Sequence, residues 1–296
     1  MRIRATVAAV SGALALSAFV VPAAQAADAG SSHRVDFAKY FGQYASSGKT
    51  AFSASGAVEG DLDVSFSNFK IAKAIKVGTT NKVSTTVTYT LTHGADVDIT
   101  SDNFLTVPVI YHGSDATPDS VQGPDLAAVC KAVSATTATC KGSIDIYPKT
   151  TDADLKLRNS YAGTWHGAGI ALDLESEQSA LQTGLATTLV QRNSTLTVNA
   201  APEPVKKGAT VTVTGKLSRA NWEDHKYHGY TGQSVQLQFR KKGSSTYSTL
   251  KTVKTDSTGN LKTTTKATVD GYYRYAFAGT STTPAVNATG DFVDVK

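Results

Sequence analysis

The sequence of 296 residues is most easily approached through what it lacks. It has no G-x-S-x-G motif, which many serine hydrolases carry around their nucleophile. It has only two cysteines and no C-x-x-C pair, so neither a redox dithiol nor a cysteine-based zinc site is indicated. After residue 26 no apolar run is long enough to span a bilayer. These absences argue against a hydrolase with a local motif, a thiol enzyme and a membrane-spanning protein.

The charge of the chain is also low. It carries 29 Lys and Arg against 24 Asp and Glu, and the basic residues are scattered. Loss of a signal peptide would remove Arg2 and Arg4 and leave a net charge of +3. Nucleic-acid binding usually requires a concentrated basic surface. The composition therefore predicts no nucleic-acid partner.

Residues 1–26 have the features of a secretion signal. Arg2 and Arg4 precede an apolar run at 7–21, and Ala-Gln-Ala at 24–26 is a typical cleavage site. We expect the mature chain to begin at Ala27 and to be secreted to the extracellular space.

The last hundred residues alternate apolar and polar side chains in short runs. In the run 210–218, Val211, Val213 and Leu217 fall on one side and the threonines on the other. Successive side chains of a strand point to opposite faces, so this pattern predicts strands with one buried side. Seven such runs, separated by turn signals, are typical of an immunoglobulin-like β-sandwich. They lie at 195–199, 210–218, 234–240, 247–254, 261–268, 272–278 and 291–295.

Two segments of this region also carry a family resemblance. Residues 205–215 and 270–279 resemble the opening and the penultimate strand of immunoglobulin-like domains in secreted bacterial proteins. Tyr273 resembles the tyrosine of a tyrosine corner, and Tyr275 stands where antibody domains have a strand cysteine. The resemblance implies the sandwich fold and says nearly nothing about function, because such domains serve many roles.

The first half of the chain predicts a second, less regular sandwich. We divide the sequence into a signal peptide at 1–26, an N-terminal arm at 27–60 and two sandwiches at 61–192 and 193–296. Trp165 shares a strand side with Gly167 and Gly169, which indicates packing in the core or between domains. The expected strands of the first sandwich are 83–91, 97–100, 105–111, 138–147, 164–174 and 187–191.

Cys130 and Cys140 predict a disulfide. An even pair in a secreted chain is usually oxidised. The two residues are too close in sequence for the sheet-crossing bridge of antibody domains, so we expect the bond to hold a hairpin or a surface loop.

The loop 219–231 is the leading candidate for binding. Trp222, Tyr227 and Tyr230 would give it a large aromatic contact area at the end of the second sandwich. The alternative is that Trp222 folds back into a core or packs on the neighbouring domain.

Two polar clusters invite a metal interpretation. His225 and His228, beside Glu223 and Asp224, have a zinc-like spacing but lack a firm third ligand in a suitable element. Asp96, Asp98 and Asp102 supply carboxylates for a structural calcium ion but lack the pattern of an EF-hand loop. We predict no cofactor and keep structural calcium as an alternative.

The sequence as a whole predicts a secreted, all-β, non-catalytic protein of two immunoglobulin-like sandwiches. Its expected partner is an extracellular protein or a cell-envelope component, and the sequence leaves the oligomeric state open. Two alternatives remain: a carbohydrate or cell-wall binding module that uses the aromatic loop, and an inhibitor of a secreted protease that presents the loop around Cys130 and Cys140.

Overall fold

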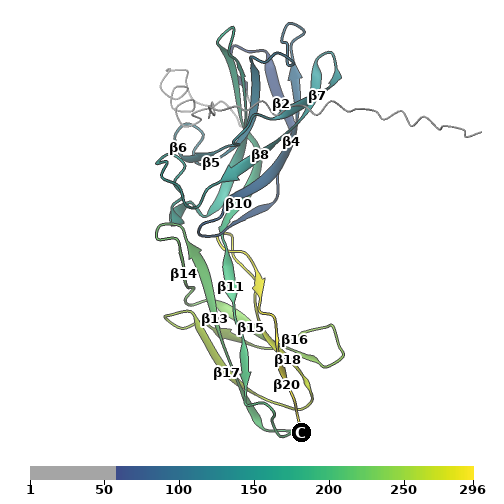
Figure 1. Ribbon diagram of the computed structural model, residues 1–296, viewed down its shortest axis with the longest axis vertical. Helices are drawn as coiled ribbons and strands as arrows, with labels where there is room; N and C mark the ends of the chain where they lie inside the picture. Colours follow the sequence, from purple (N-terminus) through teal and green to yellow (C-terminus); the bar gives the residue numbers. More distant parts are fainter. Residues whose placement is uncertain (1–57) are drawn as a thin grey trace, which may run out of the picture. The chain divides into compact units, whose positions relative to one another are not determined.

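The computed structural model describes residues 58–296, with the backbone alone considered for 58–60. The predicted signal peptide at 1–26 lies outside the described residues, as does the arm at 27–60 up to residue 57. Strands β1 to β10 form one pair of sheets and β11 to β20 form another (Figure 1).

The first pair of sheets packs as a sandwich. One sheet has the order β1-β10-β9-β5-β6, with β3 pairing in parallel to the second half of β10. The other has the order β2-β4-β8-β7. The strands are β1 (Val58–Gly60), β2 (Val64–Lys70), β3 (Ala74–Val77), β4 (Val83–His93), β5 (Phe104–Gly113), β6 (Pro118–Gln122), β7 (Val129–Ser134), β8 (Thr137–Ile146), β9 (Gly163–Asp173) and β10 (Gln178–Arg192), with one short 3-10 helix at Asn159–Tyr161.

Alternation along these strands produces the first core. Val87, Tyr89 and Leu91 of β4 are buried, while the threonines between them face outward. Trp165 is fully buried, as expected, and its indole N–H donates to the Tyr161 carbonyl at 2.7 Å. The burial of these apolar side chains is the main force that holds the sheets together.

Two glycines of β9 leave space for aromatic side chains of β2 in the facing sheet. A Cβ at Gly169 would lie 2.4 Å from the Phe66 ring, and one at Gly167 would lie 2.9 Å from the Phe69 ring. In the structure they let two phenylalanines of the opposite sheet come close.

The second pair of sheets has the strand order of an immunoglobulin-like sandwich. β13 is flanked by β11 and β12 on one side and by β14 and β17 on the other, and the facing sheet has the order β16-β15-β18, followed by β19 and β20. The strands are β11 (Ser194–Leu196), β12 (Asn199–Ala201), β13 (Thr210–Asn221), β14 (Lys226–Gly229), β15 (Ser234–Lys241), β16 (Ser248–Lys254), β17 (Asn260–Lys266), β18 (Gly271–Phe277), β19 (Val286–Asn287) and β20 (Asp291–Val293).

A tyrosine joins the two sheets of this second core. The buried Tyr275 hydroxyl donates to the Val213 carbonyl at 2.9 Å, and burial raises the pKa of Tyr275 to about 12. This bond links β18 to β13, and Tyr275 makes it from the position where antibody domains have a strand cysteine. The Tyr273 ring packs on Phe239 with centroids 4.8 Å apart. Its hydroxyl makes no hydrogen bond to another residue within 58–296, so the backbone bond that a tyrosine corner implies is not made there.

The strand predictions hold best where alternation is long. The runs predicted at 83–91, 105–111, 138–147 and 164–174 correspond to β4, β5, β8 and β9. The strand predicted at 97–100 is wrong, because those residues form turns around Asp98. β7 was missed, since both of its faces are largely exposed and it shows no alternation.

Candidate recognition site

Trp222 is not an exposed binding residue. Its side chain is fully buried and belongs to the same hydrophobic cluster as the core of β1 to β10. Its indole N–H donates to the Val77 carbonyl at 3.3 Å, and its backbone N–H donates to the Asn159 side chain at 3.1 Å. The prediction that Trp222 binds a ligand is therefore corrected in favour of the alternative that its ring packs inward, where it completes the core of β1 to β10.

The two tyrosines of the same loop do not form an aromatic platform. Tyr227 is 39% exposed, and its hydroxyl accepts a hydrogen bond from the Asn193 amide at 3.2 Å. The Tyr230 ring is covered by the Arg219 guanidinium at 3.9 Å and meets Phe277 edge-on. With Trp222 buried, the three rings offer no shared surface on which a sugar ring would stack.

The polar residues of this loop make hydrogen bonds within the loop and to Asn159, which precedes β9. The Glu223 carboxylate accepts hydrogen bonds from the backbone and the amide of Asn159. Asp224 and His228 contact each other at 2.6 Å. Within residues 58–296 no group of three or more His, Cys, Asp or Glu side chains is arranged to hold a metal ion. Asp98, from the predicted calcium cluster, accepts hydrogen bonds from the backbone and hydroxyl of Thr100.

Three of the described histidines, His93, His112 and His228, contact a carbonyl or carboxylate oxygen and not a hydroxyl nucleophile. His93 contacts the Gly94 carbonyl and His112 contacts the Asp119 carboxylate, each at 2.9 Å. The rings of Tyr161 and Trp165 pack beside His112. These contacts do not bring a serine, a histidine and a carboxylate together in the order that nucleophilic hydrolysis requires.

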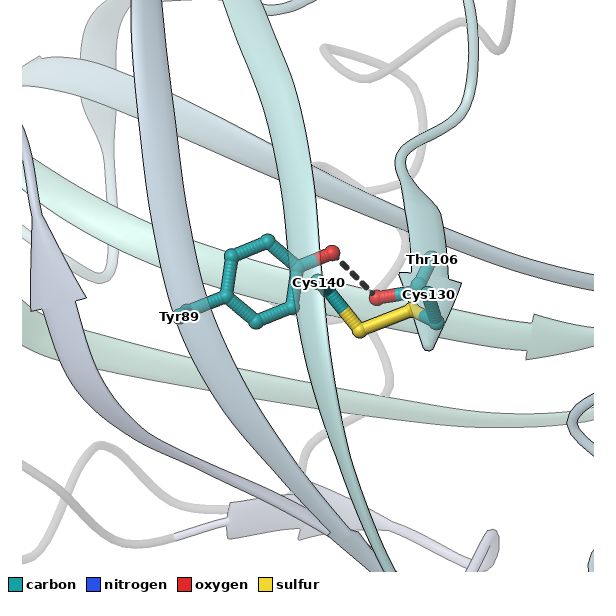
Figure 2. Close-up of a disulfide and its surroundings, with 4 residues drawn as sticks. All are labelled: Tyr89, Thr106, Cys130 and Cys140. Carbon is teal, nitrogen blue, oxygen red and sulfur yellow. Dashed lines mark hydrogen bonds between the residues drawn. A yellow bond between two sulfur atoms is a disulfide. The ribbon is translucent and has the colours of Figure 1, made fainter. Parts of the chain in front are cut away.

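The predicted disulfide is present. Cys130 of β7 is bonded to Cys140 of β8, its partner in the strand register. Figure 2 shows the bond beside Tyr89 of β4, whose hydroxyl lies 2.8 Å from that of Thr106. Cys140 and Tyr89 are buried in the first core, so the disulfide ties the exposed strand β7 to the buried part of its sheet.

The segment that this bond holds is the most exposed apolar part of the described chain. Leu126 is 80% exposed, Val129 is 78% exposed and Val133 is 70% exposed. Side chains this apolar are usually buried, and a group of them on the surface commonly marks an interaction site. No alternating pattern reveals this segment in the sequence, and Cys130 at its centre is the only local signal.

A network of charges fixes the start of the same segment. The Lys82 ammonium contacts the carboxylates of Asp125 at 2.9 Å and Asp145 at 3.2 Å. The hydrogen bond that the Lys82 ammonium donates to Asp125 raises the pKa of Lys82, so the lysine stays charged. Tyr147 donates to Asp125, and Ser84 donates to Asp145.

Burial alone would raise the pKa of Asp145. Hydrogen bonds from Ser84, the Asp125 backbone, Ser143 and Lys82 outweigh that effect, and the pKa is lowered. The carboxylate therefore stays ionised. Further along, the backbone N–H of Ala128 donates to the Thr106 carbonyl at 2.8 Å. The exposed segment is thus attached to the sandwich at Asp125, Ala128 and Cys130.

The edge position of β7 completes the site. β7 is the terminal strand of the order β2-β4-β8-β7 and pairs only with β8 among the described strands. A terminal strand presents backbone N–H and C=O groups on its outer side. Here these groups lie next to Val129 and Val133, which gives both polar and apolar contacts to an approaching chain.

Comparison with known proteins adds little about function. No family model and no curated protein matches the sequence. A marsupial T cell receptor is 12% identical with a TM-score of 0.35, over 78% of this chain and 73% of the receptor chain. Fibronectin(III)-like modules of Clostridium thermocellum CbhA are 12% identical with a TM-score of 0.26, over 78% of this chain and 92% of theirs.

A putative membrane anchored protein from Corynebacterium diphtheriae is also 12% identical, with a TM-score of 0.26, over 81% of this chain and 58% of its own. Similarities of this size carry no argument about function, so the fold assignment rests on the strand order itself. No helix in the described part of the chain is long and apolar enough to cross a membrane.

Proposed function

We propose that the chain is a non-catalytic recognition protein that binds an extended segment of another extracellular protein along the side of β7 that pairs with no other described strand. The observation that carries the proposal is an edge strand with Val129 and Val133 exposed by 78% and 70%. An extended peptide that adds to a sheet edge gains main-chain hydrogen bonds for affinity and side-chain contacts for specificity. The disulfide holds the edge in place before binding, which lowers the entropic cost of association.

Two features of β7 favour selective over indiscriminate pairing. Lys131 puts a charge between the two valines, and the register with β8 shifts between Ala132 and Ser134. Charged side chains and bulges are the means by which natural edge strands avoid aggregation. The proposed partner is therefore an extended segment with apolar residues at alternate positions. Two of these residues would contact Val129 and Val133, and the position between them would tolerate the charge of Lys131.

The proposal is tested by selecting random peptides displayed on phage against residues 27–296. We expect the enriched sequences to carry apolar residues at alternate positions. The double variant Val129→Asp and Val133→Asp should bind the selected peptides about tenfold or more weakly, because two anchoring contacts are replaced by charges.

A matched control is available on the second sandwich. Leu250 lies on the edge strand β16 and is 43% exposed, so Leu250→Asp makes the same kind of change at a different edge. This control should keep the wild-type affinity. Selection of peptides that bind the β7 variant as well as the wild type would reject β7 as the site.

The same segment supports a second candidate, inhibition of a secreted protease. A disulfide at the centre of an exposed, extended segment is the observation that favours it. A stoichiometric titration of subtilisin or trypsin activity tests this candidate. Slowing of the protease that disappears on reduction supports it, whereas cleavage of the chain within 126–133 without inhibition rejects it.

A further inference from the structure

The two halves of the described chain carry opposite net charges. Residues 194–296 contain 14 Lys and Arg against 7 Asp and Glu, a net charge of +7. Residues 58–193 contain 10 Lys and Arg against 15 Asp and Glu, a net charge of −5. The modest charge of the whole chain therefore hides a strongly basic second sandwich.

Three of its lysines share one sheet face. Lys216 of β13 and Lys262 and Lys266 of β17 are exposed, whereas Val211, Val213 and Leu261 on the other side of these strands are buried. In the strand register Lys266 lies opposite Thr210, and Lys262 lies opposite Thr214. The outward face is thus a pattern of ammonium and hydroxyl groups.

These lysines lack an anionic partner in the described part of the chain. Ion pairs within 4.0 Å are made by other lysines, namely Lys82, Lys242 and Lys296. The Lys266 ammonium donates to the Thr210 hydroxyl at 3.0 Å. Lys251, at the margin of the face, donates to the Thr264 carbonyl at 2.7 Å and adds a fourth positive charge.

A shallow depression beside Lys262 adds neutral polar groups. Asn199, Thr214 and Asn260 contribute to its lining. Asp256 also lines it, and hydrogen bonds from the backbone N–H groups of Thr258 and Asn260 lower its pKa to about 2, so this carboxylate is ionised at neutral pH. The depression therefore offers amide and hydroxyl groups and one negative charge beside Lys262, while Lys216 and Lys266 extend the row of cations.

We infer that this outward face of β12, β13 and β17 binds an anionic polysaccharide, with Lys216, Lys262 and Lys266 contacting its charged groups. Charge complementarity selects a polyanion, and the threonine and asparagine side chains suit the hydroxyls of sugar units. The outward side chains around these lysines on β13 and β17 are threonine, serine and asparagine. They offer no ring for a nucleobase to stack on, which disfavours single-stranded nucleic acid. This site is separate from β7 and does not depend on the function proposed there.

The experiment measures binding of residues 27–296 to dextran sulfate, with neutral dextran and oligo(dT) as comparison probes. We expect dextran sulfate to bind in a salt-dependent manner and neutral dextran not to bind. The triple variant Lys216→Gln, Lys262→Gln and Lys266→Gln should bind dextran sulfate roughly tenfold or more weakly. It should also show a shallower dependence of affinity on salt, because fewer counterions are released.

A control with the same change in net charge separates a site from general attraction. Lys70, Lys73 and Lys141 are exposed residues of the first sandwich outside β7, and their triple replacement by Gln removes three charges elsewhere. This control should stay within about twofold of the wild type, since the surface charges it removes lie on the other sandwich.

Equal losses in the two triple variants would overturn the inference, as would failure of the wild type to bind dextran sulfate. Tighter binding of oligo(dT) than of dextran sulfate would overturn it in favour of nucleic acid. The Val129→Asp and Val133→Asp variant should retain dextran sulfate binding, so failure of one site is distinguishable from failure of the other. Circular dichroism of each variant shows whether its fold is intact.

Discussion

The two sandwiches differ in the position of the interaction that links their strands across a sheet or between sheets. In the first, a covalent bond joins the neighbouring strands β7 and β8 at the exposed edge of one sheet. In the second, a single hydrogen bond from Tyr275 to Val213 joins the two facing sheets within the core. The disulfide thus stabilises an exposed edge, whereas the tyrosine fixes the packing of the core.

Trp222 links the two sandwiches, because it follows a strand of the second sandwich and is buried in the core of the first. It follows β13 directly in sequence, yet its ring lies in the cluster that contains Val77 and Trp165. The stability of the first core therefore depends on a residue from beyond its own last strand. The second core, by contrast, is built only from residues of the second sandwich.

The largest expected effect comes from breaking this dependence. Trp222→Ala should destabilise the first sandwich by about 3–5 kcal/mol, because it removes a large buried ring and leaves a cavity. Trp165 is then the only tryptophan, so its fluorescence during denaturant unfolding reports on the first sandwich alone.

The matched control is Leu237→Ala, which truncates a fully buried side chain of the second core. It should leave the transition followed by tryptophan fluorescence nearly unchanged, because Trp165 and Trp222 both lie in the first core, while lowering the stability of the second sandwich. An unchanged Trp165 transition in Trp222→Ala would show that the first core does not need the ring.

A smaller effect is expected from removing the edge tie. The double variant Cys130→Ala and Cys140→Ala should lower the stability of the first sandwich by about 2–3 kcal/mol, the chain-entropy value for so short a loop. Hydrogen exchange should accelerate first in β7, because that strand loses its covalent attachment to β8. Faster exchange in β18 as well would contradict a local role for the bond.

The smallest effect is expected from the core tie of the second sandwich. Tyr275→Phe should cost about 1 kcal/mol, since the buried Val213 carbonyl loses a hydrogen bond while the ring remains. Tyr273→Phe is the control, because the Tyr273 hydroxyl has no hydrogen bond within residues 58–296. Equal midpoints for the two variants in urea unfolding would remove the distinction between them.

Much of the fold was predictable because alternation is a local property. The runs around Val87 and Val213 carry one buried and one exposed side in the sequence itself, and this determines strands in either domain. The disulfide was equally predictable, since Cys130 and Cys140 are the only cysteines. β7 was not predictable, because an edge strand exposed on both faces has no hydrophobic period to detect.

Local sequence patterns suffice to predict an all-β chain of alternating strands and the pairing of its two cysteines. Which side chains are available to a partner depends on how the strands pack together. Trp222 looked like a binding residue and is buried, whereas Val129 gave no signal and is exposed. The lysines at 216, 262 and 266 are scattered in the sequence and share one face in the sheet. The reason is physical: strand formation follows from neighbours along the chain, while burial and shared surfaces follow from contacts between residues far apart in it.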